Sequence, residues 1–342
     1  MRLDLEAYLI AAQDELGMVS EVNRPSNSPS SYPLLSRHRV NHIVIYPGMF
    51  NPPHLGHLAT FNHVLDHPWL NMHVVTGIVV PTEDPPQSAT QTNSHSGAEF
   101  PISQKDRCAL WRADDRFPRH ALTWNGIGSD LRRFCWRLFQ VMAKAGLRLT
   151  FVLLVEGRDI FTMAPFNEWR ELCRETVASD LRWCLHRKDD GEGKKPDRVA
   201  GFGAWVRQFP PTPQYQLAAN DRVWSCAAAG DPARKLTLAC PCKRHIDAPG
   251  GLLVNGARIW SMIENGSARD MLKRDDGIIL NQALFFHLVG TRRQQAEKMV
   301  YWAEPVFEIR PRETAMQELE RKLREMGKTL GKAARFVDST RY

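Results

Sequence analysis

Two histidines three residues apart, His54 and His57, are the residues best placed for chemistry in this sequence. They close the stretch 48–57, Gly-Met-Phe-Asn-Pro-Pro-His-Leu-Gly-His, between an apolar run at 40–46 typical of a buried strand and a segment at 58–66 with helical spacing. Such strand-to-helix turns bind ligands in open parallel sheets, and the free N–H groups of a helix start attract anions. We predict that both imidazoles face an open cleft and hold the phosphates of a nucleoside triphosphate.

The residues around the histidines fit the same chemistry. Gly56 carries no side chain, so a phosphate can approach the backbone there. Pro52 and Pro53 stiffen the approach at positions where no backbone donor is needed. Each imidazole can donate a hydrogen bond, and near pH 7 it can also carry a positive charge beside a phosphate.

Strands and helices alternate along the chain, which predicts the fold class. Strands are expected at 40–46, 72–80, 149–155 and 181–186, and helices at 58–66, 129–144, 166–176 and from residue 103 onward. Strand and helix in alternation favour an α/β fold with a doubly wound, Rossmann-like parallel sheet.

Composition divides the chain into three regions. Residues 1–36 are expected to form an N-terminal helix and a Ser/Pro-rich linker, 37–300 the Rossmann-like domain, and 301–342 a C-terminal helical extension. Within the domain, about 188–250 is expected to be an insertion packed on the edge of the sheet, because it holds several Pro and Gly and only short strand-like runs.

Charge and composition exclude several classes of partner. The net charge is +7 and the pI about 9.1, but no cluster of Lys and Arg with interleaved aromatics is present, so nucleic acid is not expected as a partner. No apolar run approaches the ~18 residues of a membrane span, and residues 1–17 lack a signal-peptide core, which favours a cytoplasmic or nuclear protein. The seven cysteines are scattered, and Cys240-Pro241-Cys242 with His245 only partly matches zinc-ligand spacing because C-x-C is not the usual C-x₂₋₄-C. Reduced thiols and no protein-held metal are therefore expected, and the oligomeric state stays open.

The stretch 48–57 resembles the first signature of the adenylyl/cytidylyltransferase superfamily, the nucleotidyltransferases with a His-x-Gly-His motif. Its Asn-Pro-Pro-His form is most similar to the nicotinamide/nicotinate mononucleotide adenylyltransferases and their fungal-type relatives. The resemblance covers roughly 40–290 and implies the nucleotidyltransferase type of Rossmann-like fold. It implies catalytic roles for His54 and His57 and nucleotide contacts at Gly48, Met49, Phe50, Asn51 and Gly56.

Shorter matches follow in the expected order. Asp106-Arg107 resembles the acidic-Arg pair of the family, and Gly157-x-Asp159 resembles its Gly-x-Asp turn after a strand. The resemblance therefore implies nucleotide contacts at Gly157 and Asp159 and substrate contacts at Arg107 and Trp169, the latter by stacking on a base. From the residues alone, Trp169 could equally be core, Arg107 a salt-bridge residue and Asp159 a helix cap.

The second signature of the family, Ile-Ser-Ser/Thr-Thr-x-Ile-Arg, is degenerate at 254–260. Asn255 and the two residues after it replace the hydroxyl donors, and Trp260 stands in place of the arginine. Asn255 and Arg258 remain as candidate nucleotide contacts. Arg258 lies two residues before the family position, about 200° around a helix, so it reaches a different direction.

The resemblance implies transfer of a nucleoside monophosphate, most simply AMP from ATP, to a phosphorylated small molecule with release of pyrophosphate and with Mg²⁺ as cofactor. The degenerate second signature leaves open a catalytically impaired, nucleotide-binding relative with a scaffold or regulatory role. The acceptor stays open too, because residues 82–87 are acidic where many mononucleotide adenylyltransferases carry lysines.

Overall fold

The computed structural model describes residues 4–18, 22–23, 32–66, 72–84, 102–160, 168–169, 171–179, 198–208, 222–240, 259, 279–281 and 283–288. Its elements are, in chain order, α1 (Leu5–Leu16), β1 (Val22–Asn23), β2 (Asn41–Gly48), α2 (Leu55–Leu65), β3 (His73–Pro81), α3 (Gln104–Ala113), β4 (Leu122–Trp124), α4 (Gly128–Lys144), β5 (Leu149–Glu156), a 3-10 turn (Gly157–Ile160), β6 (Cys173–Ser179), β7 (Val206–Gln208), β8 (Arg222–Ala228) and β9 (Asp231–Cys240).

The strands form one sheet in the order β1-β4-β3-β2-β5-β6-β9-β8-β7. Neighbouring strands from β4 to β9 pair in parallel, whereas β1, β8 and β7 pair antiparallel with their neighbours. Counted along the chain, the parallel strands therefore stand in the order 3-2-1-4-5-6, which is the order of Rossmann dinucleotide-binding folds. The protein has a Rossmann-like α/β fold, as the alternation of elements predicts.

Helices cover both faces of the sheet, and the strand sequences require this. In β2, Ile43 and Ile45 belong to one buried cluster while Val44 and Tyr46 belong to the other. A strand that is apolar on both sides is stable only when both sides are covered. The first cluster contains residues of α1 and α4, and the second contains residues of α2 together with Trp111 of α3.

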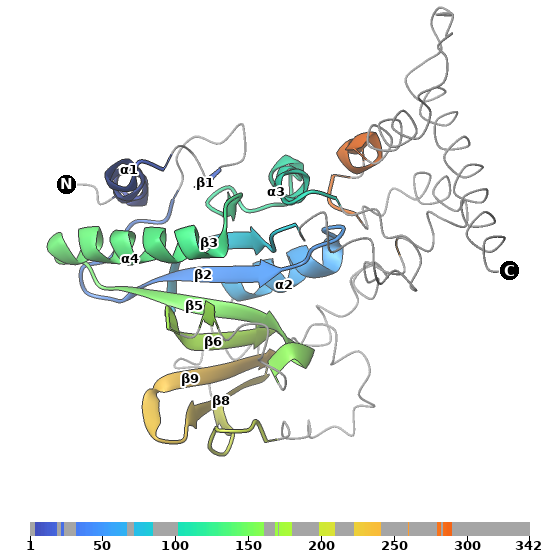
Figure 1. The fold of residues 1–342 in the computed structure, drawn as a ribbon. Coiled ribbons are helices and arrows are strands. Elements are labelled where there is room, and N and C mark those ends of the chain that lie inside the picture. Colours follow the sequence, from blue (N-terminus) through green and yellow to red (C-terminus); the bar gives the residue numbers. More distant parts are fainter. Residues whose placement is uncertain are drawn as a thin grey trace, which may run out of the picture.

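The order of the strands reverses between β2 and β5, and this crevice is the switch point of the sheet. Both strands end at the same edge of the sheet, toward which their arrowheads point in Figure 1. Register pairs Ile45 with Leu153, so Gly48 and Glu156, each three residues further along its strand, end at the same level. The stretch 48–57 therefore begins where ligands bind in such folds.

One expectation for the second half of the sheet needs correction. A helix was expected at 166–176, but β6 begins at Cys173 and is buried from Thr176 to Ser179. The β-branched pair Thr176-Val177 suits a central parallel strand, and sequence periodicity does not separate so short a run from a helix. The expected strand at 181–186 lies outside the described residues.

The region expected as an edge insertion extends the sheet in its own plane. β9 pairs in parallel with β6, and β8 and β7 continue outward as antiparallel strands. The residues at 188–197, 209–221 and 241–250 of this region lie outside the described part. β9 is thus a member of the main parallel series.

Four cysteines, Cys108, Cys135, Cys173 and Cys226, are buried free thiols. Burial raises the pKa of Cys108 to about 12 and that of Cys226 to about 11, so these groups stay protonated at neutral pH. In the part of the chain that the structure describes, no helix is both long and apolar enough to cross a membrane.

We expect the free energy of unfolding to fall as the pH drops below about 6.5. Burial lowers the pKa of His42 and of His120. As the pH falls, both side chains therefore bind protons in the unfolded chain before they do so in the folded chain. The stability that the two neutral histidines contribute is therefore fully present above about pH 6.5, and it is lost as the pH falls toward their lowered pKa values. Urea unfolding between pH 8 and pH 5 measures the slope, and His42→Asn should flatten it. Equal slopes for the two proteins would contradict the assignment.

Candidate functional site

The loop after β2 is shaped by the ring of Phe50. This residue has a φ of 46°, and its ring is buried with centroids 4.9 Å from Tyr46, 5.4 Å from Trp111 and 5.0 Å from His57. A Cβ at Gly48 would lie 2.7 Å from the same ring, so glycine is required at that position. Both residues were expected to contact nucleotide; here they pack the loop, and the exposed neighbour is Met49, at 65%.

The two histidines cap their own helix. His54 is the N-cap of α2, and its Nδ1 accepts a hydrogen bond from the backbone N–H of Gly56 at 3.2 Å. The Nδ1 of His57 accepts in turn from the N–H of His54 at 3.4 Å, which completes a reciprocal capping box. The two rings stack with centroids 3.6 Å apart.

This capping box decides where the imidazole protons lie. A ring nitrogen that accepts a hydrogen bond carries no proton, so in both rings the proton is on Nε2. The Nε2–H groups of His54 and His57 are therefore hydrogen-bond donors. Each ring was expected to be able to carry a positive charge near pH 7, but protonating either Nδ1 would break a hydrogen bond of the capping box.

Residues from far along the chain cover His54. Ile279 forms an isolated bridge with His54, and the N–H of Leu280 donates to the carbonyl of Pro53 at 3.1 Å. His54 is 1% exposed as a result. The expectation that both imidazoles face an open cleft is therefore wrong for His54 in this arrangement. A ligand could reach His54 only if residues 279–281 moved.

Residues 279–281, which cover His54, are hydrogen-bonded to the end of α3. Asn281 donates from its backbone N–H to Asp114 Oδ2 at 3.0 Å and from its side chain to the Ala113 carbonyl at 2.6 Å. Burial raises the pKa of Asp114, but hydrogen bonds from Arg116 and Asn281 outweigh it and hold the pKa below its ordinary value. Asp114 is therefore ionised at neutral pH, and the hydrogen bond that it accepts from Asn281 holds residues 279–281 in place.

His57 is the more exposed of the two histidines. Its side chain is 12% exposed, and its Nε2 lies 3.6 Å from Oε1 of Glu156, whose side chain is 13% exposed. Glu156 is the last residue of β5, so the pair spans the switch point between β2 and β5. Sequence reasoning missed Glu156. The available signal was a single carboxylate ending an otherwise apolar strand.

The residues that follow Glu156 form a 3-10 turn, Gly157–Ile160. Gly157 is buried and Asp159 is partly exposed, so of the two expected nucleotide contacts only Asp159 presents part of its surface to solvent. Trp169 is 2% exposed and belongs to the core beneath α1 and α4. This placement favours the core interpretation of Trp169 over base stacking.

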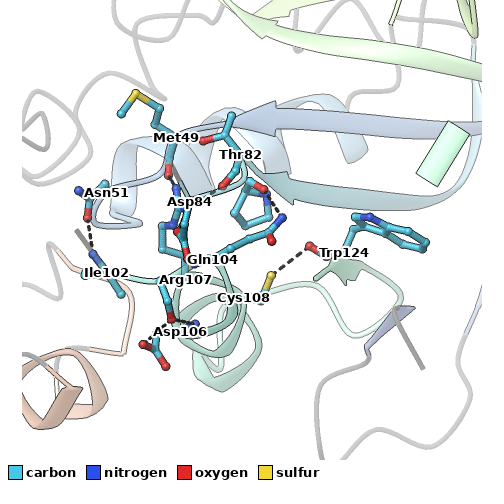
Figure 2. A network of polar contacts seen from close by, with 12 residues as sticks. Met49, Asn51, Thr82, Asp84, Ile102, Gln104, Asp106, Arg107, Cys108 and Trp124 are labelled. Carbon is cyan, nitrogen blue, oxygen red and sulfur yellow. Dashed lines mark hydrogen bonds and ion pairs between the residues drawn. The ribbon is translucent and has the colours of Figure 1, made fainter. Parts of the chain in front are cut away.

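Arg107 is turned inward, toward the ends of two strands (Figure 2). It is 4% exposed, and its guanidinium donates to the carbonyl of Met49 after β2, and to the carbonyl of Thr82 at 2.6 Å and the carboxylate of Asp84 at 2.8 Å after β3. We expected Arg107 to contact substrate phosphate. In this arrangement it braces the loop that carries the histidines, together with the N–H of Ile102, which donates to Asn51 Oδ1 at 3.4 Å.

The acidic residues after β3 cap two neighbouring helices. Asp84 accepts from the N–H of Gln104 at the start of α3, at 2.8 Å, and Glu83 accepts from the N–H of Gly128 at the start of α4, at 2.9 Å. These carboxylates compensate the positive ends of both helices. Their capping role explains why this chain has acidic residues where many mononucleotide adenylyltransferases carry lysines.

The carboxylates near the end of β5 bear on the Mg²⁺ that the family resemblance implies. Mg²⁺ keeps several waters and takes one or two carboxylates plus phosphate oxygens. Glu156 supplies a carboxylate next to His57 at the end of β5, and Asp159 supplies another in the 3-10 turn that follows. The described residues contain no cluster of three or more His, Cys, Asp or Glu able to hold a metal alone. This donor set fits a cation that arrives with a polyphosphate.

The capping role of His54 is directly testable. Asn is among the best N-cap residues and Ala among the poorest, so His54→Ala should be less stable than His54→Asn by about 1 kcal/mol. Both variants lose the buried ring, so their difference isolates the cap. Chemical denaturation of the two variants measures it, and equal midpoints would argue against the capping box.

Asn255 and Arg258, the remaining candidate nucleotide contacts, lie outside the described residues, as does Trp260. No protein family model matches this sequence, and no curated protein matches it either.

Proposed function

We propose that this protein is a nucleotidyltransferase that binds a nucleoside triphosphate, with ATP as the first candidate, at the switch point between β2 and β5. It transfers the nucleoside monophosphate to a phosphorylated small molecule. The phosphate of the acceptor attacks the α-phosphorus, the bond to the β-phosphate oxygen breaks, and pyrophosphate leaves. No protein nucleophile takes part, so catalysis depends on positioning and on donors aimed at phosphoryl oxygens.

The observation that carries the proposal is the orientation of His57. Its Nδ1 is occupied by the capping box, so its Nε2–H is the donor directed toward the end of β5 at the switch point of a 3-2-1-4-5-6 sheet. An imidazole donor at a helix start suits a phosphoryl oxygen, since the helix dipole adds to the hydrogen bond. Mg²⁺, when bound with the triphosphate, supplies charge neutralisation of the phosphates.

A nucleotide-binding protein without turnover is the second candidate. Two observations favour it: His54 is buried beneath Ile279, and Trp260 stands where the family resemblance expects an arginine. A transferase that loses preorganised donors loses about 10²- to 10³-fold in rate for each, whereas ground-state binding can survive on the remaining contacts.

A two-part experiment separates the candidates. Pyrophosphate release is followed with ATP or CTP against a panel of phosphorylated acceptors in the presence of Mg²⁺, and binding of each nucleotide is followed by calorimetry. Pyrophosphate that requires both substrates supports the transferase. Nucleotide binding without any product supports the second candidate. The absence of binding for both nucleotides would overturn both.

A further inference from the structure

Glu156 occupies an unexpected position for a polyphosphate site. Its carboxylate oxygen lies 3.6 Å from Nε2 of His57, and Nε2–H is the donor that the proposed function directs at phosphate. The two side chains are only 13% and 12% exposed, so solvent screens them poorly. A phosphate that accepts from His57 must therefore lie beside a carboxylate of the same sign.

Such proximity of two anions is unfavourable in a poorly solvated crevice. Like charges within about 4–6 Å disfavour the charged form of each other, and the effect grows as the effective dielectric falls. The backbone of Glu156 is paired with Ser179 of β6 at the end of β5, so its carboxylate stays within the reach of one side chain from the crevice. Free ATP, with its uncompensated phosphates, should therefore bind weakly.

A divalent cation reverses this interaction. Mg²⁺ prefers oxygen ligands and is commonly held by one or two carboxylates together with substrate phosphates. Placed between the carboxylate and the phosphate oxygens, the cation converts their repulsion into two attractions. Asp159, partly exposed in the 3-10 turn that follows Glu156, is a further carboxylate near the end of β5.

We propose that Glu156 makes this site selective for the metal-complexed form of a polyphosphate, and that it couples cation binding to nucleotide binding. The proposal rests on the proposed function, because it takes the same crevice as the nucleotide site. By linkage, the factor by which Mg²⁺ tightens ATP binding equals the factor by which ATP tightens Mg²⁺ binding. Glu156 supplies most of that factor.

Calorimetry of the full chain with ATP, in Mg²⁺ and in EDTA, measures the coupling. For the unmodified protein we expect Mg²⁺ to tighten ATP binding about 30-fold, within the usual range of coupling between two ligands. Glu156→Gln should bind metal-free ATP about tenfold more tightly than the unmodified protein does, and its gain from Mg²⁺ should shrink to about threefold. Inorganic triphosphate as a second probe should behave in the same way, because the coupling acts on the phosphates.

Two variants serve as controls. Glu156→Asp keeps the charge and should keep most of the coupling. Glu175→Gln removes a carboxylate from β6 four residues before the end of that strand, and it should leave the coupling unchanged. Thermal unfolding of each variant establishes that it is folded before binding is measured.

The outcomes separate this inference from the proposed function. If ATP binds but Glu156→Gln shows the same dependence on Mg²⁺ as the unmodified protein, the inference fails and the proposed function stands. If Mg²⁺ does not tighten ATP binding to the unmodified protein, the inference fails without any variant. If ATP binds under neither condition, the proposed function fails and the inference fails with it.

Discussion

Replacing His57 with glutamine should reduce pyrophosphate release at least about 10²-fold while leaving the protein folded. Glutamine at the third helical position is a usual member of a capping box, so it can accept from the N–H of His54 as the imidazole does. Its amide NH2 is also a donor, but no ring fixes it, so the donor that His57 Nε2–H places at the switch point is no longer preorganised. Initial rates at saturating ATP and acceptor, together with calorimetric affinities, measure the effect.

The choice of variant separates chemistry from stability. His57→Ala removes both the donor and the cap, so it should lose the rate and also about 1 kcal/mol of stability. His38→Ala, at an exposed position in the loop before β2, is the matched control and should keep both. If His57→Gln retained full turnover, the central role of this imidazole in the proposed function would be lost.

The largest effect on stability is expected at Arg107. Arg107→Met should lower the free energy of unfolding by about 2–4 kcal/mol, because a buried side chain that bridges two strand ends is lost. The carbonyls of Met49 and Thr82 would lose a charged donor. Asp84 is 45% exposed, so solvent can compensate part of its loss. Urea denaturation with the unmodified protein as reference measures the change.

Two comparisons identify the mechanism at Arg107. Lys105→Met removes an exposed cation from the same helix and should change stability by less than about 0.5 kcal/mol. Arg107→Lys keeps the charge but loses the planar guanidinium that reaches both strand ends. Its stability should therefore lie between that of the unmodified protein and that of Arg107→Met. A loss of nucleotide binding in Arg107→Lys with full stability would instead favour the direct phosphate contact that the family resemblance implies.

The elements that sequence reasoning placed well are those defined by neighbours along the chain. The expected helix at 129–144 and strand at 149–155 match α4 and β5 to within a residue. Ser103 caps α3 as its spacing from Asp106 predicts, with the hydroxyl accepting from the N–H of Asp106 at 3.2 Å. Periodicity, caps and turn residues are local signals, so one sequence is enough to show them.

The site was harder to predict because its contacts join distant segments. The sequence located the histidines at a strand-to-helix turn, but it could not show that Ile279 covers one of them or that Glu156 faces the other. It left Trp169 and Arg107 open between structural and ligand roles, and burial of both side chains now favours the structural one. Helix and strand are also indistinguishable in short apolar runs, which is why β6 was misplaced.

By itself, then, the sequence determined the type of fold and the position of the strand-to-helix turn that carries the histidines, because both follow from hydrophobic alternation and from residues adjacent in the chain. The tertiary structure decided which atoms that turn presents. It assigned each Nδ1 to a helix cap, covered His54 with a segment from the far end of the fold, and brought the carboxylate of Glu156 to His57. Those arrangements depend on strand order and register, which no local pattern of residues encodes.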